Sequence, residues 1–291
     1  MSRRLKPVLV AALFLLLAMP LRAEVVLRIG NGAEPETLDP QRSQSVSAAA
    51  VLRDAYEGLT ELGPGGKILP GAASRWQLSD DGLRYEFELR PNARWSDGTP
   101  LLAEHFVVGM RRALDPKVAA ASAQLMLPIA NAQAVMEGRL PPESLAVTAL
   151  SPSRLQVTLT QPTPYFLGVL THPISYPAHP TATDAQKREA LVGNGAYRVV
   201  RWTPNDAIEL VRNPFYWNNA NTQIDRVFFV PVEDYDAELK RYRAGELDIT
   251  DTIPLVQAPK IRERFGTELR LTPYLGSYYY GMNLTRPPFA G

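Results

Sequence analysis

Hydrophobic and polar residues alternate strictly over residues 83–90. The apolar positions are Leu83, Tyr85, Phe87 and Leu89, and the polar positions are Arg84, Glu86, Glu88 and Arg90. A period of two is typical of a strand with one buried face and one face in water. The Asp81-Gly82 pair just before it favours a hairpin turn, because glycine tolerates the positive φ that such turns need. Residues 76–90 are therefore predicted to form a hairpin.

The spacing becomes helical after residue 100. Phe106, Met110 and Ala113 recur at intervals of three and four residues, which predicts a helix with one buried face. The helix should end at Asp115-Pro116, because proline cannot continue the backbone hydrogen-bond ladder.

The remaining elements follow from shorter patterns of the same kinds. An Ala-rich helix is predicted over residues 46–59, ending at Gly58, and another helix over residues 184–192. Further hairpins and strands are predicted at residues 145–159, 196–212, 24–30, 226–232, 247–249 and 268–272. Strands that alternate with helices after residue 164 predict a mixed, largely parallel sheet.

The segment Gly30-Asn-Gly-Ala-Glu-Pro35 follows a predicted strand and invites comparison with a dinucleotide-binding loop. Pro35 stands where that motif has its third glycine, and no helix begins there to hold a pyrophosphate at its N-terminus. The segment is therefore predicted to be a turn rather than a nucleotide site.

The N-terminus has the pattern of a signal peptide. A basic start precedes an apolar run at residues 8–19, and Ala23 completes a plausible cleavage site. Loss of residues 1–23 leaves 27 basic residues against 30 acidic ones, so the mature chain has no basic excess with which to bind nucleic acid. The alternative is that residues 8–19 remain as an uncleaved anchor helix.

The 291 residues contain no cysteine and three histidines. The lack of cysteine excludes disulfides, thiolate metal sites and a lipid anchor on cysteine. No G-x-S-x-G nucleophile motif is present, and His172 and His179 lack the spacing of a metal pair on one helix face. The sequence thus favours neither an enzyme nor a metal or other cofactor site.

Several longer motifs resemble a known family. They are Leu69-Pro-Gly-Ala-Ala-Ser-Arg-Trp76, Ser79-Asp-Asp-Gly82, Trp95-Ser-Asp-Gly-Thr-Pro100, Gly193-Asn-Gly-Ala-Tyr197, Arg212-Asn-Pro-Phe-Tyr-Trp217, Tyr242-Arg-Ala-Gly-Glu-Leu-Asp-Ile249 and Tyr278-Tyr-Tyr-Gly-Met-Asn283. Together they resemble the family 5 extracellular solute-binding proteins, in the branch of oligopeptide receptors that serve ABC importers.

The resemblance implies an α/β fold of the periplasmic-binding-protein type, a type II clamp. Lobe I, with a mixed sheet, would comprise residues 24–56 and 180–280, and lobe II, rich in β-hairpins, residues 57–179. Lobe III would begin at residues 281–291, so most of it is absent, as in a C-terminally truncated member of the family.

The same resemblance implies five ligand-binding residues. Gln44 and Val46 match a ligand-facing loop, Asp251 matches a polar contact position, and Tyr274 and Tyr279 match aromatic contact positions. Extended peptides are held mainly through their backbone in such sites, which leaves their side chains free to vary. Gln44 stands where relatives have an acidic residue, which puts a preference for basic peptide side chains in doubt.

The expected function is that of a monomeric periplasmic receptor that binds oligopeptides and delivers them to a membrane permease. An alternative is a truncated remnant or fragment of such a receptor that binds ligand weakly or not at all. Nickel, haem or a glycan remain other ligands of the same transport class, and the scarcity of histidine argues against nickel.

Overall fold

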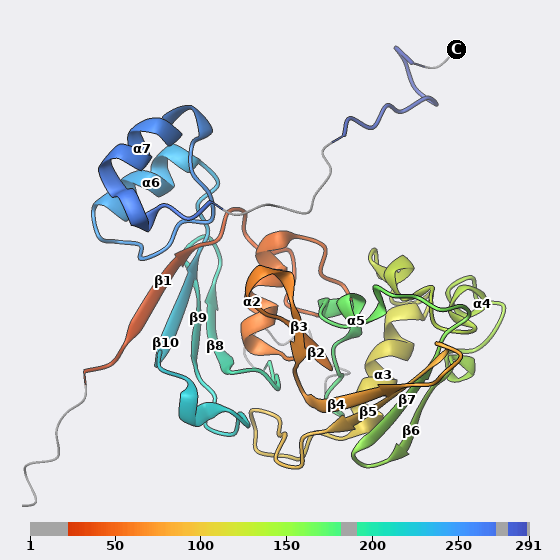
Figure 1. Ribbon diagram of the computed structural model, residues 1–291. Helices are drawn as coiled ribbons and strands as arrows, with labels where there is room; N and C mark the ends of the chain where they lie inside the picture. Colours follow the sequence, from red (N-terminus) through yellow and green to blue (C-terminus); the bar gives the residue numbers. More distant parts are fainter. Residues whose placement is uncertain (1–22, 182–190, 272–278, 290–291) are drawn as a thin grey trace, which may run out of the picture. The chain divides into compact units, whose positions relative to one another are not determined.

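The computed structural model describes residues 23–181, 191–271 and 279–289. They form two compact units that divide between Asp251 and Thr252, and the first unit holds both larger sheets (Figure 1). In these described ranges no helix is both long enough and apolar enough to cross a membrane. The helix predicted over residues 184–192 falls almost wholly outside them.

The first sheet has four strands in the order β1-β10-β9-β8. Their bounds are β1 Val26–Gly30, β8 Tyr197–Thr203, β9 Ala207–Arg212 and β10 Arg226–Val230. Only β1 and β10 are parallel, and the other two pairings are antiparallel. The prediction of a largely parallel sheet was therefore wrong. The short connections from β8 to β9 and from β9 to β10 return the chain beside the strand it has just left, and such local connections produce antiparallel neighbours.

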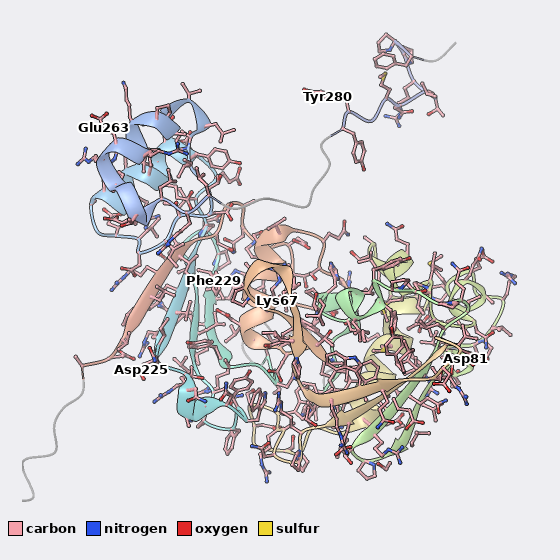
Figure 2. The ribbon with its side chains drawn as sticks, viewed as in Figure 1. Lys67, Asp81, Asp225, Phe229, Glu263 and Tyr280 are labelled. Atoms are coloured by element: carbon pink, nitrogen blue, oxygen red, sulfur yellow. The ribbon has the colours of Figure 1, made fainter. Side chains whose placement is uncertain are left out.

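Helix α2 (Val46–Ala55) lies against this sheet, and its buried residues Val51 and Leu52 belong to the same hydrophobic core as Val227 and Phe229 of β10. Phe229 is labelled in Figure 2. The helix is shorter than predicted, because Tyr56 is already extended. Gly58 is not its stop signal. A Cβ at Gly58 would lie 2.4 Å from the carbonyl oxygen of Leu170, so glycine is needed there for a close backbone approach.

The second larger sheet has the order β4-β5-β7-β6 and is entirely antiparallel. Its strands are β4 Ala73–Leu78, β5 Arg84–Leu89, β6 Val147–Ser151 and β7 Arg154–Thr158. Helix α3 (Ala103–Leu114) covers one face, on which Phe87, Phe106 and Met110 are buried. We call residues 73–159 the antiparallel module. The hairpin of β4 and β5 and the helix that follows confirm the alternating and helical patterns of this stretch.

Short elements complete the first unit. They are β2 Thr60–Leu62, β3 Ile68–Pro70, α4 Ala132–Met136, α5 Phe166–Val169 and α6 Tyr235–Arg243. Asp234 caps α6 by accepting a hydrogen bond from the amide of Ala237 at 2.7 Å.

The second unit contains α7 (Ala258–Phe265). The strand predicted over residues 268–272 is not present in the described part of that range, where a single 3-10 turn ends at Glu268 and residues 269–271 are irregular. A strand needs a neighbour to satisfy its backbone groups, and no described strand pairs with residues 269–271. The side chain of Tyr280 projects from the C-terminal segment and is 82% exposed (Figure 2).

Candidate functional site

Three parallel chain segments end at one edge of the first sheet. They are β1, β10 and the segment up to Ile249, which makes a parallel bridge to Ile29. In open sheets of this kind, ligands bind beyond the carboxyl ends of the parallel strands. We call residues 31–46 and 249–251, which continue from β1 and from that bridge, the β1 edge.

Backbone contacts fix the start of this edge. Asn31 donates its side-chain amide to the carbonyl of Ser47 at 3.1 Å, which ties the end of β1 to the first turn of α2. Gly32 has a φ of 58° and accepts a hydrogen bond from the amide of Val232 at 2.8 Å. A Cβ at Gly32 would lie 3.5 Å from an oxygen of Asp251. Asp251 and the loop after β1 are therefore neighbours.

The start of α2 is capped twice. Ser45 is the N-cap, and its Oγ accepts a hydrogen bond from the amide of Ala48 at 3.0 Å. Glu36 accepts hydrogen bonds from the amides of Gln44 at 2.5 Å and Ser45 at 3.2 Å, and from the hydroxyl of Ser45 at 2.5 Å. Burial raises the pKa of Glu36, but the hydrogen bonds from Ser45 and Gln44 outweigh it and hold this pKa below its usual value.

A side chain of the antiparallel module fixes the middle of the loop. Arg112 of α3 donates two hydrogen bonds to the carboxylate of Asp39, at 2.7 and 2.5 Å, and one to the side chain of Gln41 at 2.9 Å. Gln41 in turn donates to the carbonyl of Tyr176 at 3.0 Å. A bidentate arginine–carboxylate pair is among the more directional contacts in proteins. The loop is thus fixed to helix α3 and to the segment that contains Tyr176.

The predicted site residues divide into three groups. Gln44, Val46 and Asp251 all belong to the β1 edge and are exposed, Val46 to 72%. Tyr279 is 82% exposed but belongs to the second unit. Tyr274 lies outside the described residues.

Two residues of this region were not predicted from the sequence. Glu36 acts on residues eight and nine positions away, and Arg112 lies 73 positions from Asp39. Local periodicity cannot reveal such pairs. The sequence Ser45-Val-Ser-Ala48 does contain a helix N-cap signal, which could have indicated where the loop ends.

Two acidic residues, Glu57 and Glu61, lie close together near Tyr216 and Trp217. Glu57, 2% exposed, accepts hydrogen bonds from the hydroxyl of Tyr216 at 2.6 Å and from the indole of Trp217 at 3.0 and 2.9 Å. Burial, followed by the nearby charge of Glu61, raises the pKa of Glu57 well above its usual value. Burial also raises the pKa of Glu61, which is hydrogen-bonded to Glu57. Both carboxyl groups therefore have raised pKa values in the folded chain.

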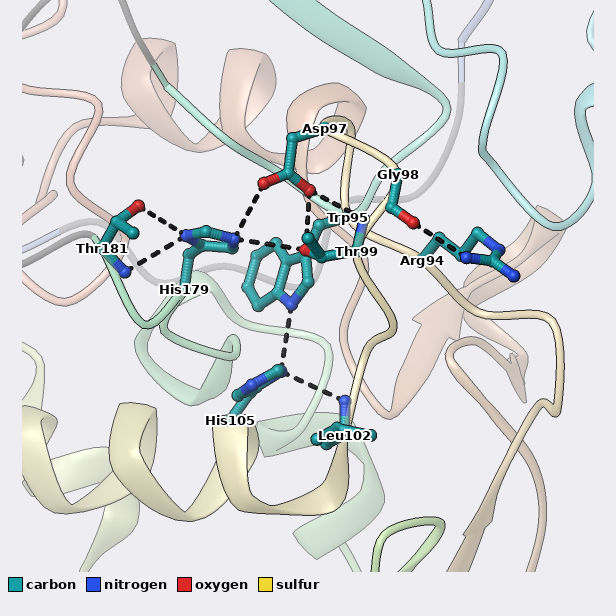
Figure 3. Close-up of polar contacts among 9 residues, drawn as sticks. All are labelled: Arg94, Trp95, Asp97, Gly98, Thr99, Leu102, His105, His179 and Thr181. Atoms are coloured by element: carbon teal, nitrogen blue, oxygen red, sulfur yellow. Dashed lines mark hydrogen bonds and ion pairs between the residues drawn. The ribbon is translucent and has the colours of Figure 1, made fainter.

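His105 and His179 serve as hydrogen-bond partners (Figure 3). His105 Nδ1 accepts from the indole of Trp95 at 3.0 Å and from the amide of Leu102 at 3.1 Å, which gives the start of α3 a partner that Leu102 itself cannot supply. Burial lowers the pKa of His105, in keeping with an unprotonated Nδ1. His179 contacts Asp97 and Thr181 at 3.3 and 2.8 Å. Among the described residues, no cluster of three or more potential metal ligands is found.

A cavity of about 720 Å³ lies in the first unit away from these residues. Its walls include Leu125, Asn131, Arg139 and Tyr165. Of the predicted ligand-binding residues that the structure describes, none lines it.

Comparison with known proteins gives consistent matches. The family model "Bacterial extracellular solute-binding proteins, family 5 Middle" matches residues 67–291. The probable deoxycholate-binding periplasmic protein YgiS of Escherichia coli is 39% identical over 93% of this chain and 52% of its own length. The periplasmic oligopeptide-binding protein OppA of Salmonella typhimurium is 37% identical over 89% of this chain and 49% of its own.

Solved structures agree. Haemophilus influenzae OppA in complex with RPPGFSPFR gives a TM-score of 0.87 at 35% identity, over 92% of this chain and 54% of that one. Burkholderia pseudomallei OppA gives 0.88 at 32% identity, over the same shares. The chain therefore spans about half the length of the relatives that it matches.

Proposed function

This chain belongs to the bacterial extracellular solute-binding proteins of family 5, with the type II clamp fold of that family, and on this premise we propose that it binds oligopeptides in the periplasm for delivery to the permease of an ABC importer. The observation that carries the proposal is the match to oligopeptide-binding relatives over most of this chain, including a structure with a bound peptide. The β1 edge supplies the place on this chain where the peptide would lie.

The geometry of this edge suits a ligand of variable sequence. Gln44 and Val46 are exposed on a loop whose backbone is fixed, and Asp251 lies beside the loop after β1. A fixed loop can hold a ligand without itself losing conformational freedom on binding. We propose that Gln44, Val46, Asp251, Tyr274 and Tyr279 contact the peptide.

The lobe assignment remains part of this proposal. Residues 24–56 and 180–280 would form lobe I around the first sheet. Residues 57–179 would form lobe II, which includes the antiparallel module, and lobe III would start at residue 281. Because the relatives are about twice as long, closure of the clamp depends on contacts from a portion equivalent to their second half.

We also propose the cellular setting. Residues 1–23 would be removed as a signal peptide, with cleavage near Ala23, and the mature chain would remain unlipidated and monomeric in the periplasm. Its partners would be the peptide and the importer permease. The basic start, the apolar run at residues 8–19 and the absence of cysteine support this setting.

A bile acid is the second candidate ligand. The relative with 39% identity is named as a probable deoxycholate-binding protein. The exposed apolar side chain of Val46, beside the uncharged Gln44, could contact the apolar face of such a steroid.

Calorimetric titration tests these candidates. The purified chain from residue 24 is titrated with a pool of tri- to pentapeptides and, separately, with deoxycholate. Heat and a rise in thermal stability with peptide alone would support the proposal. A response to deoxycholate alone would replace it with the second candidate. No response to either, from a folded protein, would favour the remnant or fragment without binding.

A further inference from the structure

Glu36 lies beside the proposed ligand-binding residues without having been assigned to them. It lies in the first part of the loop after β1, whereas Gln44 and Val46 stand at the loop's end, where α2 begins. Its carboxylate spans this interval by hydrogen bonds to Gln44 and Ser45. We propose that Glu36 is a positioning residue, which holds Gln44 and Val46 in the conformation that faces the ligand; the ligand-facing part of this inference rests on the proposed function.

The carboxylate of Glu36 accepts three hydrogen bonds at this point of the loop. One oxygen of Glu36 accepts from the amides of Gln44 and Ser45, and the other accepts from the Ser45 hydroxyl. With its proton directed to Glu36, the Ser45 oxygen accepts from the amide of Ala48 and the hydroxyl of Ser47. Glu36 therefore orients the residue that caps α2, and with it the backbone that leads into Val46.

The middle of the loop has separate contacts. Arg112 and Gln41 fix residues 39–41 to α3 and to Tyr176, but their hydrogen bonds do not reach Gln44 or Ser45. Loss of Glu36 would therefore free residues 44–45 while residues 39–41 stay in place. The effect should be local, since α2 keeps its Ser45 cap and its buried face.

A carboxylate fits this position better than an amide does. Two backbone amides and one hydroxyl all donate to Glu36, and a carboxylate has acceptor oxygens on both arms. Glutamine could still accept from the two amides, but its nitrogen could not accept from Ser45. Alanine would remove all three contacts. Glu36→Gln should thus be intermediate between the parent and Glu36→Ala.

Amide hydrogen exchange at Gln44 and Ser45, followed by NMR, tests the role of Glu36 without any ligand. Hydrogen bonds to a charged group stabilise by about 1.5–3 kcal/mol, so Glu36→Ala should speed exchange at both amides by about tenfold or more. Glu36→Gln should give a smaller change. Glu86→Ala, which removes an exposed carboxylate paired with Arg154, is the matched control and should leave both rates unchanged. Unchanged rates in a folded Glu36→Ala variant would overturn the proposal.

Titration of the same variants with the peptide pool tests the ligand-facing part. The dissociation constant should rise about tenfold for Glu36→Ala, by less for Glu36→Gln, and not for Glu86→Ala. Faster exchange with unchanged affinity would show that the loop conformation does not serve binding, and would overturn that part. If the parent binds no peptide, the proposed function fails, while the exchange rates still decide whether Glu36 holds the loop.

Discussion

In the antiparallel module, Phe87, Trp95 and Phe106 are at most 1% exposed, whereas at the β1 edge the apolar side chain of Val46 is 72% exposed. The sheet of the module packs on α3, and the indole of Trp95 donates a hydrogen bond to His105. The β1 edge has a fixed backbone, and the side chains of Gln44, Val46 and Asp251 on it are exposed. A rigid backbone with exposed side chains is what a binding surface requires, and a closed core is what its support requires.

The difference indicates how mutations should separate stability from binding. Truncations in the module should lower the free energy of unfolding. Truncations at the edge should lower affinity alone. Residues that join the two regions should fall between these limits.

The largest effect is expected for Trp95→Ala. The side chain is fully buried and lies 4.9 Å from the ring of His179 and 6.4 Å from that of Tyr56, measured between ring centroids. Loss of a buried aromatic side chain should cost about 3–5 kcal/mol in the free energy of unfolding, measured with urea. Trp95→Phe is the control, and should cost less. Equal losses would show that the indole hydrogen bond to His105, and not the ring volume, dominates.

A smaller loss is expected for Arg112→Met, which removes the link between the module and the loop. Asp39, with a side chain 9% exposed, would then be a buried charge without its arginine. The loss should be about 2 kcal/mol, below the value for a fully buried pair because Arg112 is partly exposed. Asp39→Asn in the same background should restore part of the stability. Additive losses in this double-mutant cycle would argue against a direct coupling.

Glu61→Gln should raise stability, in a manner that depends on pH. Folding raises the pKa of Glu57 and Glu61 above 4.5, the usual pKa of a glutamate. Their contribution to the free energy of unfolding is therefore fully present below about pH 4.5, and it is lost as the pH rises through the raised pKa values. Glutamine keeps the polar group at this position but carries no charge that would oppose the ionisation of Glu57. The variant should be more stable than the parent by on the order of 1 kcal/mol at pH 8, with a smaller difference at pH 5. Urea unfolding from pH 5 to 8.5 measures this, and a gain independent of pH would contradict it.

The smallest effect on stability is expected for Val46→Ser at the β1 edge. An exposed position should change the free energy of unfolding by less than about 0.5 kcal/mol. Affinity for the peptide pool should fall about fivefold, which corresponds to about 1 kcal/mol of lost apolar contact. Val108→Ser, at an exposed position of α3, is the matched control and should leave affinity unchanged. Equal affinity of Val46→Ser and the parent would exclude Val46 from the ligand contact.

The sequence determined the elements whose signals are local. The alternation over residues 83–90 gave β5 its buried face, helical spacing gave α3, and the Asp81-Gly82 turn is seen with φ 71° at Gly82. Each of these three elements depends on residues within a few positions of one another, so the sequence pattern is enough to predict it. The longer motifs also carried enough information to identify the family.

Only the tertiary structure decided which segments meet. It placed β10 between β1 and β9, brought Asp251 beside Gly32, and gave Asp39 its partner in Arg112 and Gln44 its partner in Glu36. It also showed that glycine is required at residue 58 by a carbonyl more than a hundred positions away. The hydrophobic periodicity of a helix or strand predicts which of its faces is buried, but not which element packs against that face. Contacts between distant residues depend on how whole elements pack together, and no local sequence pattern predicts that packing.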